Sequence, residues 1–380
     1  MKNGVNNGGS TVSNLYVHFP FCRRKCAYCA LYSVPGSTPG QRAEHVRLAA
    51  VCVCARNLRP RTVYFGGGTP ALCDLRPFRG MFPPDAEFTV ELHPRDVTDE
   101  KLDELKSIGV NRISLGVQSF CDATLASMGR LHSSEEAARA FGRIRAAGFG
   151  NSGLDLIVGW PGDGGALDSV RRAIDLGVVH VSVYTLIVEP GTQLSGRIGG
   201  GCVAGMPTDD AMLDAIAEIG DLLSSAGIRR YEISNYAKPG FECRHNLAVW
   251  HGEDYLGIGP GAHSRVGYRR WRVADGWEAV DEETLDPLDD ARERAIFALR
   301  LTDGIDFDRA EGLLRPASGN PEERQLQLVK WKNVLNAWRS HLDGLCAPGI
   351  VQRISSSRYA LTRRGMEVCD SVESDLFAKS

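Results

Sequence analysis

Three cysteines lie within eight positions near the start of the chain, in the segment "CRRKCAYC". Cys22, Cys26 and Cys29 stand at i, i+4 and i+7, so one compact loop could point all three thiolates at a single centre. Thiolates are the usual protein ligands of iron–sulfur clusters, and three of them leave one iron of a cubane open. From these residues alone, the alternatives are a structural zinc with His18 as fourth ligand, or three unrelated thiols.

Composition limits what the rest of the chain can be. The 380 residues are 43% hydrophobic and carry a formal charge of only −3, which favours a globular protein with one large core and an appended domain. Near-neutral charge does not favour binding to nucleic acid, and no uninterrupted apolar stretch is long enough to predict stable membrane insertion. Eleven cysteines, an odd number without an apolar export segment, indicate reduced thiols and a cytoplasmic protein. The polar, Gly- and Asn-rich residues 1–14 are expected to be flexible.

The elements that must position the cysteines follow an α/β pattern. Ala- and Leu-rich segments such as 98–109 and 133–148 begin with a Thr or Ser cap, end in Gly and are predicted helices. They separate short β-branched runs. The predicted strands are 15–19, 62–68, 87–92, 112–118, 154–160 and 180–186. The pattern predicts a partial (β/α)6 TIM-like barrel over 15–240, with polar residues at the carboxyl ends of the strands.

Two segments between the early strands complicate this prediction. Residues 42–58 and 71–86 are short for full crossover helices, so either these helices are trimmed or the barrel is partly open. After residue 240 the alternation stops, and 241–289 are expected to form a connecting segment. Residues 290–380 contain helix-like stretches, a small hairpin and a final helix, which predicts a winged-helix-like α+β domain.

The cysteine segment is similar to the CxxxCxxC signature of the radical S-adenosylmethionine (SAM) superfamily, and "YFGGGTP" follows it on the second predicted strand. The motifs "YVHFPFC", "VELHP", "SLGVQSF", "MGRLHSSEEA" and "GLDLIVGWPG" resemble, in order, the branch that holds oxygen-independent coproporphyrinogen III oxidase and the heme chaperone HemW. The resemblance covers almost the whole chain. It implies a radical SAM barrel with a 4Fe–4S cluster on Cys22, Cys26 and Cys29, whose open iron binds SAM.

The resemblance also implies a role for each matching residue around SAM. Tyr16 would lie against the cluster and SAM, while Gly67, Gly68 and Thr69 would meet the methionyl amino group. Glu91 and Arg130 would meet the carboxylate end, and Gln118 and Asp155 the ribose hydroxyls. An unpaired carboxylate at the end of an apolar strand is costly to bury, so the alternative for Glu91 and Asp155 is a structural salt bridge.

Two features distinguish members of this branch. The oxidases resemble CxxxCxxCxC and carry a long N-terminal extension, whereas position 31 here is Leu and about fifteen residues precede the first strand. "HNLAVW" resembles the chaperone motif HNxxYW, with Val249 where Tyr is expected. This implies heme bound through His245, with His251, His263 or Cys243 as alternative axial ligands. A structural histidine that bonds a neighbouring carbonyl is the other interpretation.

The leading hypothesis is a heme chaperone that delivers heme to acceptor proteins such as respiratory cytochromes. It would need an electron donor if SAM is cleaved, and a homodimer is an option. One alternative is oxygen-independent coproporphyrinogen III oxidation, in which a 5′-deoxyadenosyl radical abstracts hydrogen from a propionate side chain. Another is a degenerate member retained for binding or regulation, suggested by Leu31, Val249 and the short early helices. Whether the protein is a catalyst stays open at this point.

The remaining cysteines suggest no chemistry. Cys52 and Cys54 are two positions apart in an apolar helical stretch and do not share a face, so they are expected to be buried small hydrophobes. The other isolated cysteines are Cys73, Cys121, Cys202, Cys346 and Cys369.

Overall fold

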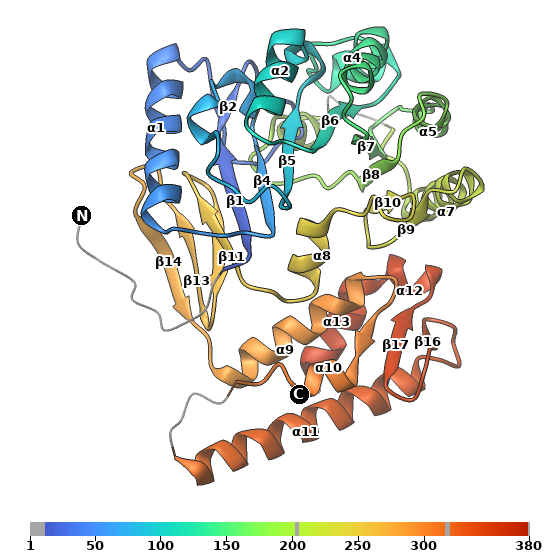
Figure 1. The fold of residues 1–380 in the computed structure, drawn as a ribbon. Helices are drawn as coiled ribbons and strands as arrows, with labels where there is room; N and C mark the ends of the chain where they lie inside the picture. Colours follow the sequence, from blue (N-terminus) through green and yellow to red (C-terminus); the bar gives the residue numbers. More distant parts are fainter. Residues whose placement is uncertain (1–11, 202–204, 316–319, 379–380) are drawn as a thin grey trace.

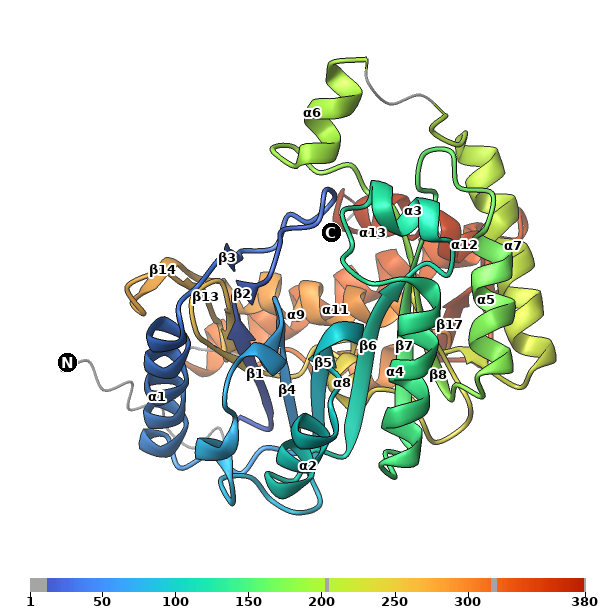
Figure 2. The ribbon, with the colours of Figure 1, turned by 90° about the horizontal axis from the view of Figure 1, so that it is seen from above.

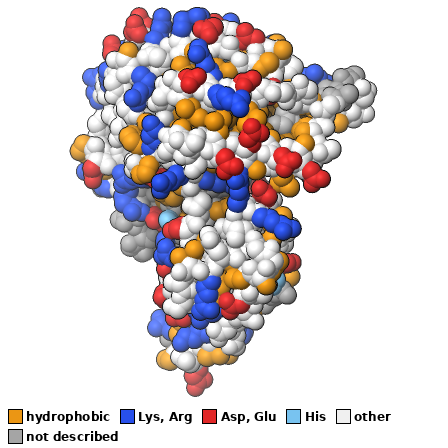
Figure 3. All heavy atoms as spheres, turned by 90° about the vertical axis from the view of Figure 1, so that its right-hand side faces the viewer, with side chains coloured by type: hydrophobic (Ala, Val, Ile, Leu, Met, Phe, Trp, Pro, Cys, Tyr) orange, Lys and Arg blue, Asp and Glu red, His pale blue; other side chains and the backbone are white. Residues whose placement is uncertain are grey.

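The computed structural model describes residues 12–201, 205–315 and 320–378 (Figure 1). Most of the N-terminal segment expected to be flexible, and the isolated Cys202, lie outside these residues. No helix within the described ranges is both long and apolar enough to span a bilayer. Acidic and basic side chains are interspersed on the face shown in Figure 3, which fits the small net charge.

A twelve-stranded sheet forms the body of the molecule. Six of its strands run parallel in chain order, as the sequence pattern predicts. They are β1 (Asn14–Phe19), β4 (Thr62–Gly67), β5 (Glu87–Leu92), β6 (Arg112–Gln118), β7 (Asn151–Val158) and β8 (His180–Thr185). Their side chains are mostly buried, because helices cover one side of the curved sheet (Figure 2). The fold is therefore α/β with the partial barrel expected from the sequence.

The helices of this part begin where cap residues predict. Thr98 caps α2, and Ser133 and Glu136 form a capping box on α4. The helices are α1 (Pro39–Ala55), α2 (Asp99–Ser107), α3 (Asp122–Ser127), α4 (Ser134–Ala146), α5 (Ala166–Asp175), α6 (Gln193–Gly199) and α7 (Asp209–Ser225). The expectation of a trimmed helix at 42–58 is wrong, because Pro39 and the Thr38 cap start a full helix of 17 residues. Residues 71–86 do contain only short 3-10 turns, η1 (Pro70–Leu72) and η2 (Arg76–Phe78).

Residues 241–289 form a helix and four strands, and so contain more regular structure than the connecting segment that the sequence predicted. Helix α8 (Arg244–Trp250) leads into β11, which pairs parallel to β1, and three further antiparallel strands extend the sheet. These strands are β11 (Tyr255–Ile258), β12 (His263–Val266), β13 (Arg269–Val273) and β14 (Ala279–Thr284). At the opposite edge the large sheet ends with β10 (Asn235–Ala237) and β9 (Arg229–Arg230). A separate two-stranded sheet beside the cysteine loop consists of β2 (Phe21–Cys22) and β3 (Val34–Pro35).

The C-terminal region has a hydrophobic core of its own, around Trp331, Trp338, Phe307 and Tyr359. A three-stranded antiparallel sheet and several helices surround it, in agreement with the expected small α+β arrangement. The elements are α9 (Pro287–Phe297), η4 (Ala298–Arg300), β15 (Ile305–Asp306), α10 (Phe307–Glu311), α11 (Pro321–Gly344), β16 (Val351–Arg353), β17 (Arg358–Leu361), α12 (Arg363–Glu367) and α13 (Cys369–Ala378).

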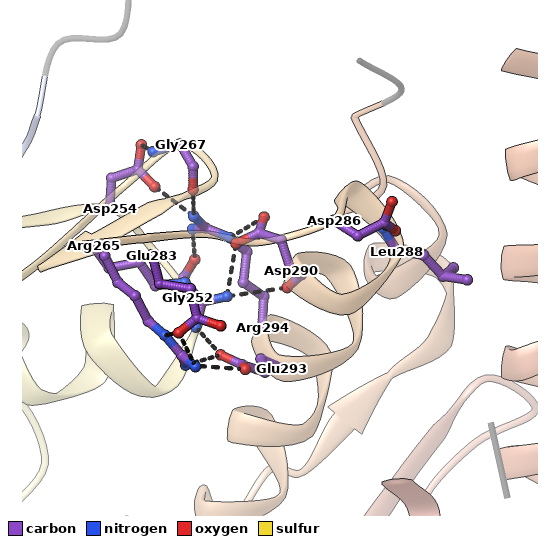
Figure 4. A network of polar contacts seen from close by, with 11 residues as sticks. Gly252, Asp254, Arg265, Gly267, Glu283, Asp286, Leu288, Asp290, Glu293 and Arg294 are labelled. Carbon is purple, nitrogen blue, oxygen red and sulfur yellow. Dashed lines mark hydrogen bonds and ion pairs between the residues drawn. The ribbon is translucent and has the colours of Figure 1, made fainter. Parts of the chain in front are cut away.

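A buried ionic network joins helix α9 to the extended sheet (Figure 4). The guanidinium of Arg294, only 2% exposed, lies 2.7 Å from Asp290 Oδ2 and 2.8 Å from Asp254 Oδ1, and it also donates to the carbonyls of Gly252 and Gly267. Arg265 on β12 reaches the same Asp290 at 2.7 Å. Each buried charge is thus paired and hydrogen-bonded, which a buried ion requires.

Replacing Arg294 with Leu should destabilise the protein strongly. Removing Arg294 takes the buried ion pair away from Asp254 and leaves Asp290 with Arg265 as its one remaining cation in the network, and breaking a buried pair costs about 3 to 5 kcal/mol. Arg171→Ala is the matched control, because its ion pair with Asp168 is solvent-exposed and contributes about 0 to 1 kcal/mol. Urea unfolding measures both. Equal midpoints for the two variants would show that the network is not important for stability.

Candidate functional site

The three cysteines line one cavity of about 360 Å³ at the carboxyl end of the parallel strands. Parallel barrels build their active sites at this end, because the loops after the strands converge there. Most of the residues that the sequence resemblance assigns to SAM line the same cavity. They are Gly67, Gly68, Glu91, Gln118, Arg130 and Asp155.

The backbone of the cysteine loop is turned so that its three cysteines line the same cavity. The Cys29 amide donates to the Cys26 carbonyl at 3.2 Å, which turns the loop between these residues. Burial, together with repulsion from Cys29 and Cys26, raises the pKa of the Cys22 thiol to about 11. The thiols are therefore close enough to disfavour one another's ionisation. A bound cationic centre would reverse this, since metal coordination deprotonates thiols.

The structure does not favour His18 as a zinc ligand. Its Nδ1 lies 3.0 Å from the Tyr16 hydroxyl and its Nε2 lies 2.9 Å from the Tyr32 carbonyl oxygen, so both ring nitrogens are engaged. Among the described residues, no group of three or more Cys, His, Asp or Glu side chains is arranged to hold a single metal ion. The three cysteines of the loop instead line a cavity that is larger than the site of a single metal ion.

Arg130 provides a buried positive charge in the cavity, which Arg24 and Lys25 also line. Its Nη1 lies 3.5 Å from Cys26 Sγ and its Nη2 donates to the Gly116 carbonyl, while its buried Nε has no hydrogen-bond partner among the described residues. A buried donor without a partner is costly, and a ligand carboxylate would satisfy it. The residues present therefore fit a cluster with SAM beside it.

The glycine-rich segment packs directly on the strand that leads to the cysteines. A Cβ on Gly68 would lie 2.6 Å from the Phe21 carbonyl oxygen, and Gly67 has a φ of +102°, so neither position accommodates another residue without strain. The amides of Gly68 and Thr69 donate to the Phe19 and Phe21 carbonyls. Thr69 is buried and its hydroxyl bonds the Cys22 thiol, and it does not line the main cavity.

Neither predicted carboxylate forms an ion pair with a described residue, which disfavours the salt-bridge alternative. Glu91 accepts from the Tyr64 hydroxyl at 2.8 Å and from the Gly67 amide at 3.0 Å, and Asp155 accepts from Ser114 at 2.9 Å. Burial, with a contribution from Asp155, raises the pKa of Glu91 to about 7.

Replacing Glu91 with Gln should stabilise the protein without SAM at high pH. The raised pKa means that the folded state favours protonated Glu91, so this contribution is fully present below about pH 4.5 and is lost as the pH rises through about 7. Gln does not ionise, so the variant should exceed wild type in stability above pH 7 and match it near pH 4. Glu136→Gln is the control of opposite sign, since hydrogen bonds lower the pKa of Glu136. Thermal unfolding across pH tests this, and a pH-independent difference would contradict it.

Gln118 and Tyr16 occupy different surroundings. Gln118 lines the cavity at a bulge where the register between β6 and β7 shifts, and it has a φ of +73°. Such bulges re-aim a side chain. Tyr16 does not line the cavity in this structure. Its hydroxyl pairs with His18, and its ring stacks on Tyr64 with centroids 6.0 Å apart.

His245 lies deep in the structure at the other end of the strands. It is buried, its Nδ1 is 2.8 Å from the hydroxyl of Thr62, the first residue of β4, and its amide donates to Glu87. Burial and Arg112 lower the pKa of the imidazole to about 4, so it is neutral. Because Thr62 engages Nδ1, a bond to iron would have to form through Nε2.

The alternative axial ligands differ in accessibility. Cys243 is buried, His251 is half-buried and His263 is exposed.

The two cysteines of α1 differ in exposure. The expectation that Cys54 is buried is wrong, because it lies on the solvent-facing side of the helix, whereas Cys52 is half-buried.

Sequence reasoning missed two sets of residues at this site. Tyr64 contacts Glu91, and its position two residues before Gly66 on a predicted strand could have placed it on the same inward face. The cavity mouth also has exposed apolar side chains, among them Leu31 at 55% and Ile187 at 68% exposure, next to Arg24 and Lys25. No local pattern in the sequence indicates that the segments around 31 and 187 meet.

Comparison with known proteins places this geometry in a family. The radical SAM superfamily profile matches residues 16–174. The heme chaperone HemW of Mycobacterium tuberculosis (strain ATCC 25618 / H37Rv) is 39% identical over 278 residues, which cover 68% of this chain and 70% of that protein. The chain belongs to the HemW family of radical SAM proteins. HemW of Escherichia coli (strain K12) is 37% identical over 276 residues, covering 68% of this chain and 72% of that protein.

A solved structure supports the fold of this HemW-family chain. Coproporphyrinogen III oxidase (HemN) from Escherichia coli, a radical SAM enzyme, superposes with a TM-score of 0.77 over 96% of this chain and 89% of that chain, at 20% sequence identity. At this identity the likeness establishes the shared fold alone. Membership of the radical SAM superfamily implies a 4Fe–4S cluster and SAM.

Proposed function

We propose that the protein is a cytoplasmic heme chaperone, which holds a 4Fe–4S cluster and SAM in the cysteine-lined cavity and delivers heme to acceptor hemoproteins such as respiratory cytochromes. The observation that carries the proposal is the cavity itself. It combines three cysteines and the buried Arg130 with Leu31 at the mouth, where the related oxidases would have a fourth thiol. The 37 to 39% identity to HemW proteins supports the same function.

In this proposal Cys22, Cys26 and Cys29 hold the cluster, and its open iron binds the amino and carboxylate groups of SAM. Arg130 would offer its Nε to the carboxylate, while its Nη1 lies beside Cys26, and Glu91 would meet the same amino-acid end from the lining of the cavity. Gly67 and Gly68 allow the close approach of the backbone, with Thr69 supporting Cys22.

Further residues surround the rest of SAM. Gln118 and Asp155 would hold the ribose hydroxyls, since both line the cavity on β6 and β7, the strands that follow the β5 strand of Glu91. Tyr16 does not line the cavity and would support it indirectly, because its ring stacks on the ring of Tyr64.

Heme is proposed to bind at the segment that starts helix α8, with His245 Nε2 as axial ligand. Trp250, the last residue of α8, would supply an aromatic surface for the macrocycle. His245 is buried, so binding requires α8 to move away from Glu87 and Thr62, whose side chains hold it. Heme uptake is therefore expected to be coupled to a local opening of α8.

The test is hemin titration of the anaerobically reconstituted protein, followed by mixing with an apo-cytochrome. We expect a Soret band to form on the protein and then to move to the acceptor in a molar yield near one. Serum albumin loaded with hemin is the control for passive transfer. Hemin that never binds, or that reaches the acceptor no faster than from albumin, would contradict the proposal.

A further inference from the structure

Tyr64 connects helix α8 to the cysteine-lined cavity through Glu91, which lines that cavity. Its hydroxyl donates to Glu91 at 2.8 Å, and its ring lies 5.3 Å from the His245 ring, tilted by 38°. The same ring packs against a small cluster that contains Leu247 on α8 and Cys243 just before it. One side chain of the barrel interior therefore contacts a cavity residue, Glu91, with its hydroxyl and contacts α8 with its ring.

Strands β4 and β5 also contact α8 through residues that precede Tyr64 and Glu91. Thr62 and Glu87 are direct register partners in β4 and β5, and both bind α8, through the His245 ring and the helix amides. Tyr64 and Glu91 follow them at even spacing, so they face the same interior side of the sheet. Neighbouring strands thus each carry one residue that holds α8, and the pair formed by Tyr64 and Glu91 leads from there to the cavity that Glu91 lines.

The far end of α8 contacts the C-terminal region. The Trp250 ring packs edge-to-face on Phe297 with centroids 6.1 Å apart, and the Arg300 guanidinium lies 5.2 Å above it. A shift of α8 would therefore reach α9 and η4 as well as the barrel. The helix is only seven residues long, and its first turn depends on Glu87 for hydrogen bonding.

Glu91 has competing partners. Tyr64 and the Gly67 amide occupy its two oxygens, while the cavity it lines has room for a ligand that carries an ammonium group. An ammonium donor brings a full positive charge to the carboxylate, so it attracts Glu91 more strongly than the neutral phenol does. A ligand ammonium that takes the position of the Tyr64 hydroxyl on this oxygen would displace that hydroxyl.

We propose that Tyr64 is a positioning residue that couples occupancy of the cysteine-lined cavity to the opening of helix α8. The coupling rests on the proposed function in that SAM is the ligand of the cavity, and the heme site on α8 is a separate part of that function. When SAM engages Glu91, the Tyr64 hydroxyl loses its acceptor, the ring shifts against His245, and α8 is held less firmly. SAM would thereby expose the segment that binds heme.

The test is hydrogen exchange at the amides of residues 244–251 in the reconstituted protein, with and without SAM. Allosteric couplings are typically about 5- to 150-fold, so SAM should speed exchange in wild type by at least about fivefold. Tyr64→Phe keeps the ring but cannot bond Glu91. It should still bind SAM, and α8 exchange should no longer respond.

Tyr231→Phe is the matched control. It also removes a buried hydroxyl in the same cluster, one that bonds His180 and the Cys243 amide but not Glu91, so the SAM response should persist. Unchanged α8 exchange on adding SAM to wild type, or a wild-type response in Tyr64→Phe, would overturn the coupling. Failure to bind hemin alongside a normal exchange response would instead contradict the heme part of the proposed function and leave the coupling standing.

Discussion

Cys26→Ala should lose essentially all cluster-bound iron and sulfide after anaerobic reconstitution, while the chain stays folded. The reason is that each of the three thiols is a direct ligand, and the loop contains no other cysteine to replace the lost one. Loss of the broad visible absorption of the cluster and chemical iron and sulfide analysis measure the effect. Circular dichroism verifies the fold, since Cys26 is only half-buried.

Cys54→Ala is the matched control for this experiment. It removes an exposed thiol that faces solvent on α1, so iron and sulfide content should equal wild type. Full iron and sulfide content in Cys26→Ala would contradict the cluster assignment. A wild-type protein that assembles no cluster would support the hypothesis of a degenerate, non-catalytic member.

His245→Ala should weaken hemin binding about tenfold or more, with unchanged iron and sulfide content. The imidazole is separated from the cysteine loop by the length of β4, so loss of a heme ligand acts locally. The loss should stop short of abolition, because His251 at the end of the same helix is only half-buried and offers a second imidazole. Hemin titration followed at the Soret band measures the affinity.

His245→Gln separates ligation from packing. It retains a side chain that can hydrogen-bond Thr62, so it should keep α8 in place and still lose hemin affinity. Wild-type hemin binding with an unmoved Soret band in either variant would make His245 a structural residue and move the heme site elsewhere, with His251→Ala as the next variant.

The parallel strands were predictable because both faces of each are buried. The run "EFTVEL" is apolar or β-branched almost throughout and forms β5 at 87–92, as predicted. Strand β7 begins at Asn151, three residues before the prediction, because polar Asn151 and Ser152 give no apolar signal and are kept in the sheet by pairing with β6.

The sheet extension was not predictable from local pattern. Strand β13 reads "RRWRV", and its arginines are neutralised by acidic partners on β14, with Arg269 on Glu282, Arg270 on Glu283 and Arg272 on Asp281. Such a strand depends on its cross-strand neighbours rather than on apolar periodicity.

The candidate site was largely predictable for a topological reason. Residues at the carboxyl ends of parallel strands converge wherever the strands are correctly identified, so Glu91, Gln118 and Asp155 reach one cavity with the cysteines. The partners of each side chain were not predictable. That Thr69 turns to Cys22, that Tyr64 binds Glu91 and that His245 faces the barrel interior depend on packing between segments far apart in the chain.

The measurement that tests the chaperone function most directly is incubation of the reconstituted, hemin-competent protein with coproporphyrinogen III, SAM and a reductant under anaerobic conditions. Vinyl-bearing porphyrinogen product is quantified by chromatography. The chaperone function predicts that no product forms above the Cys26→Ala background, while the same preparation transfers heme to an apo-cytochrome. Repeated turnover of coproporphyrinogen III would contradict it and establish the protein as an oxidase.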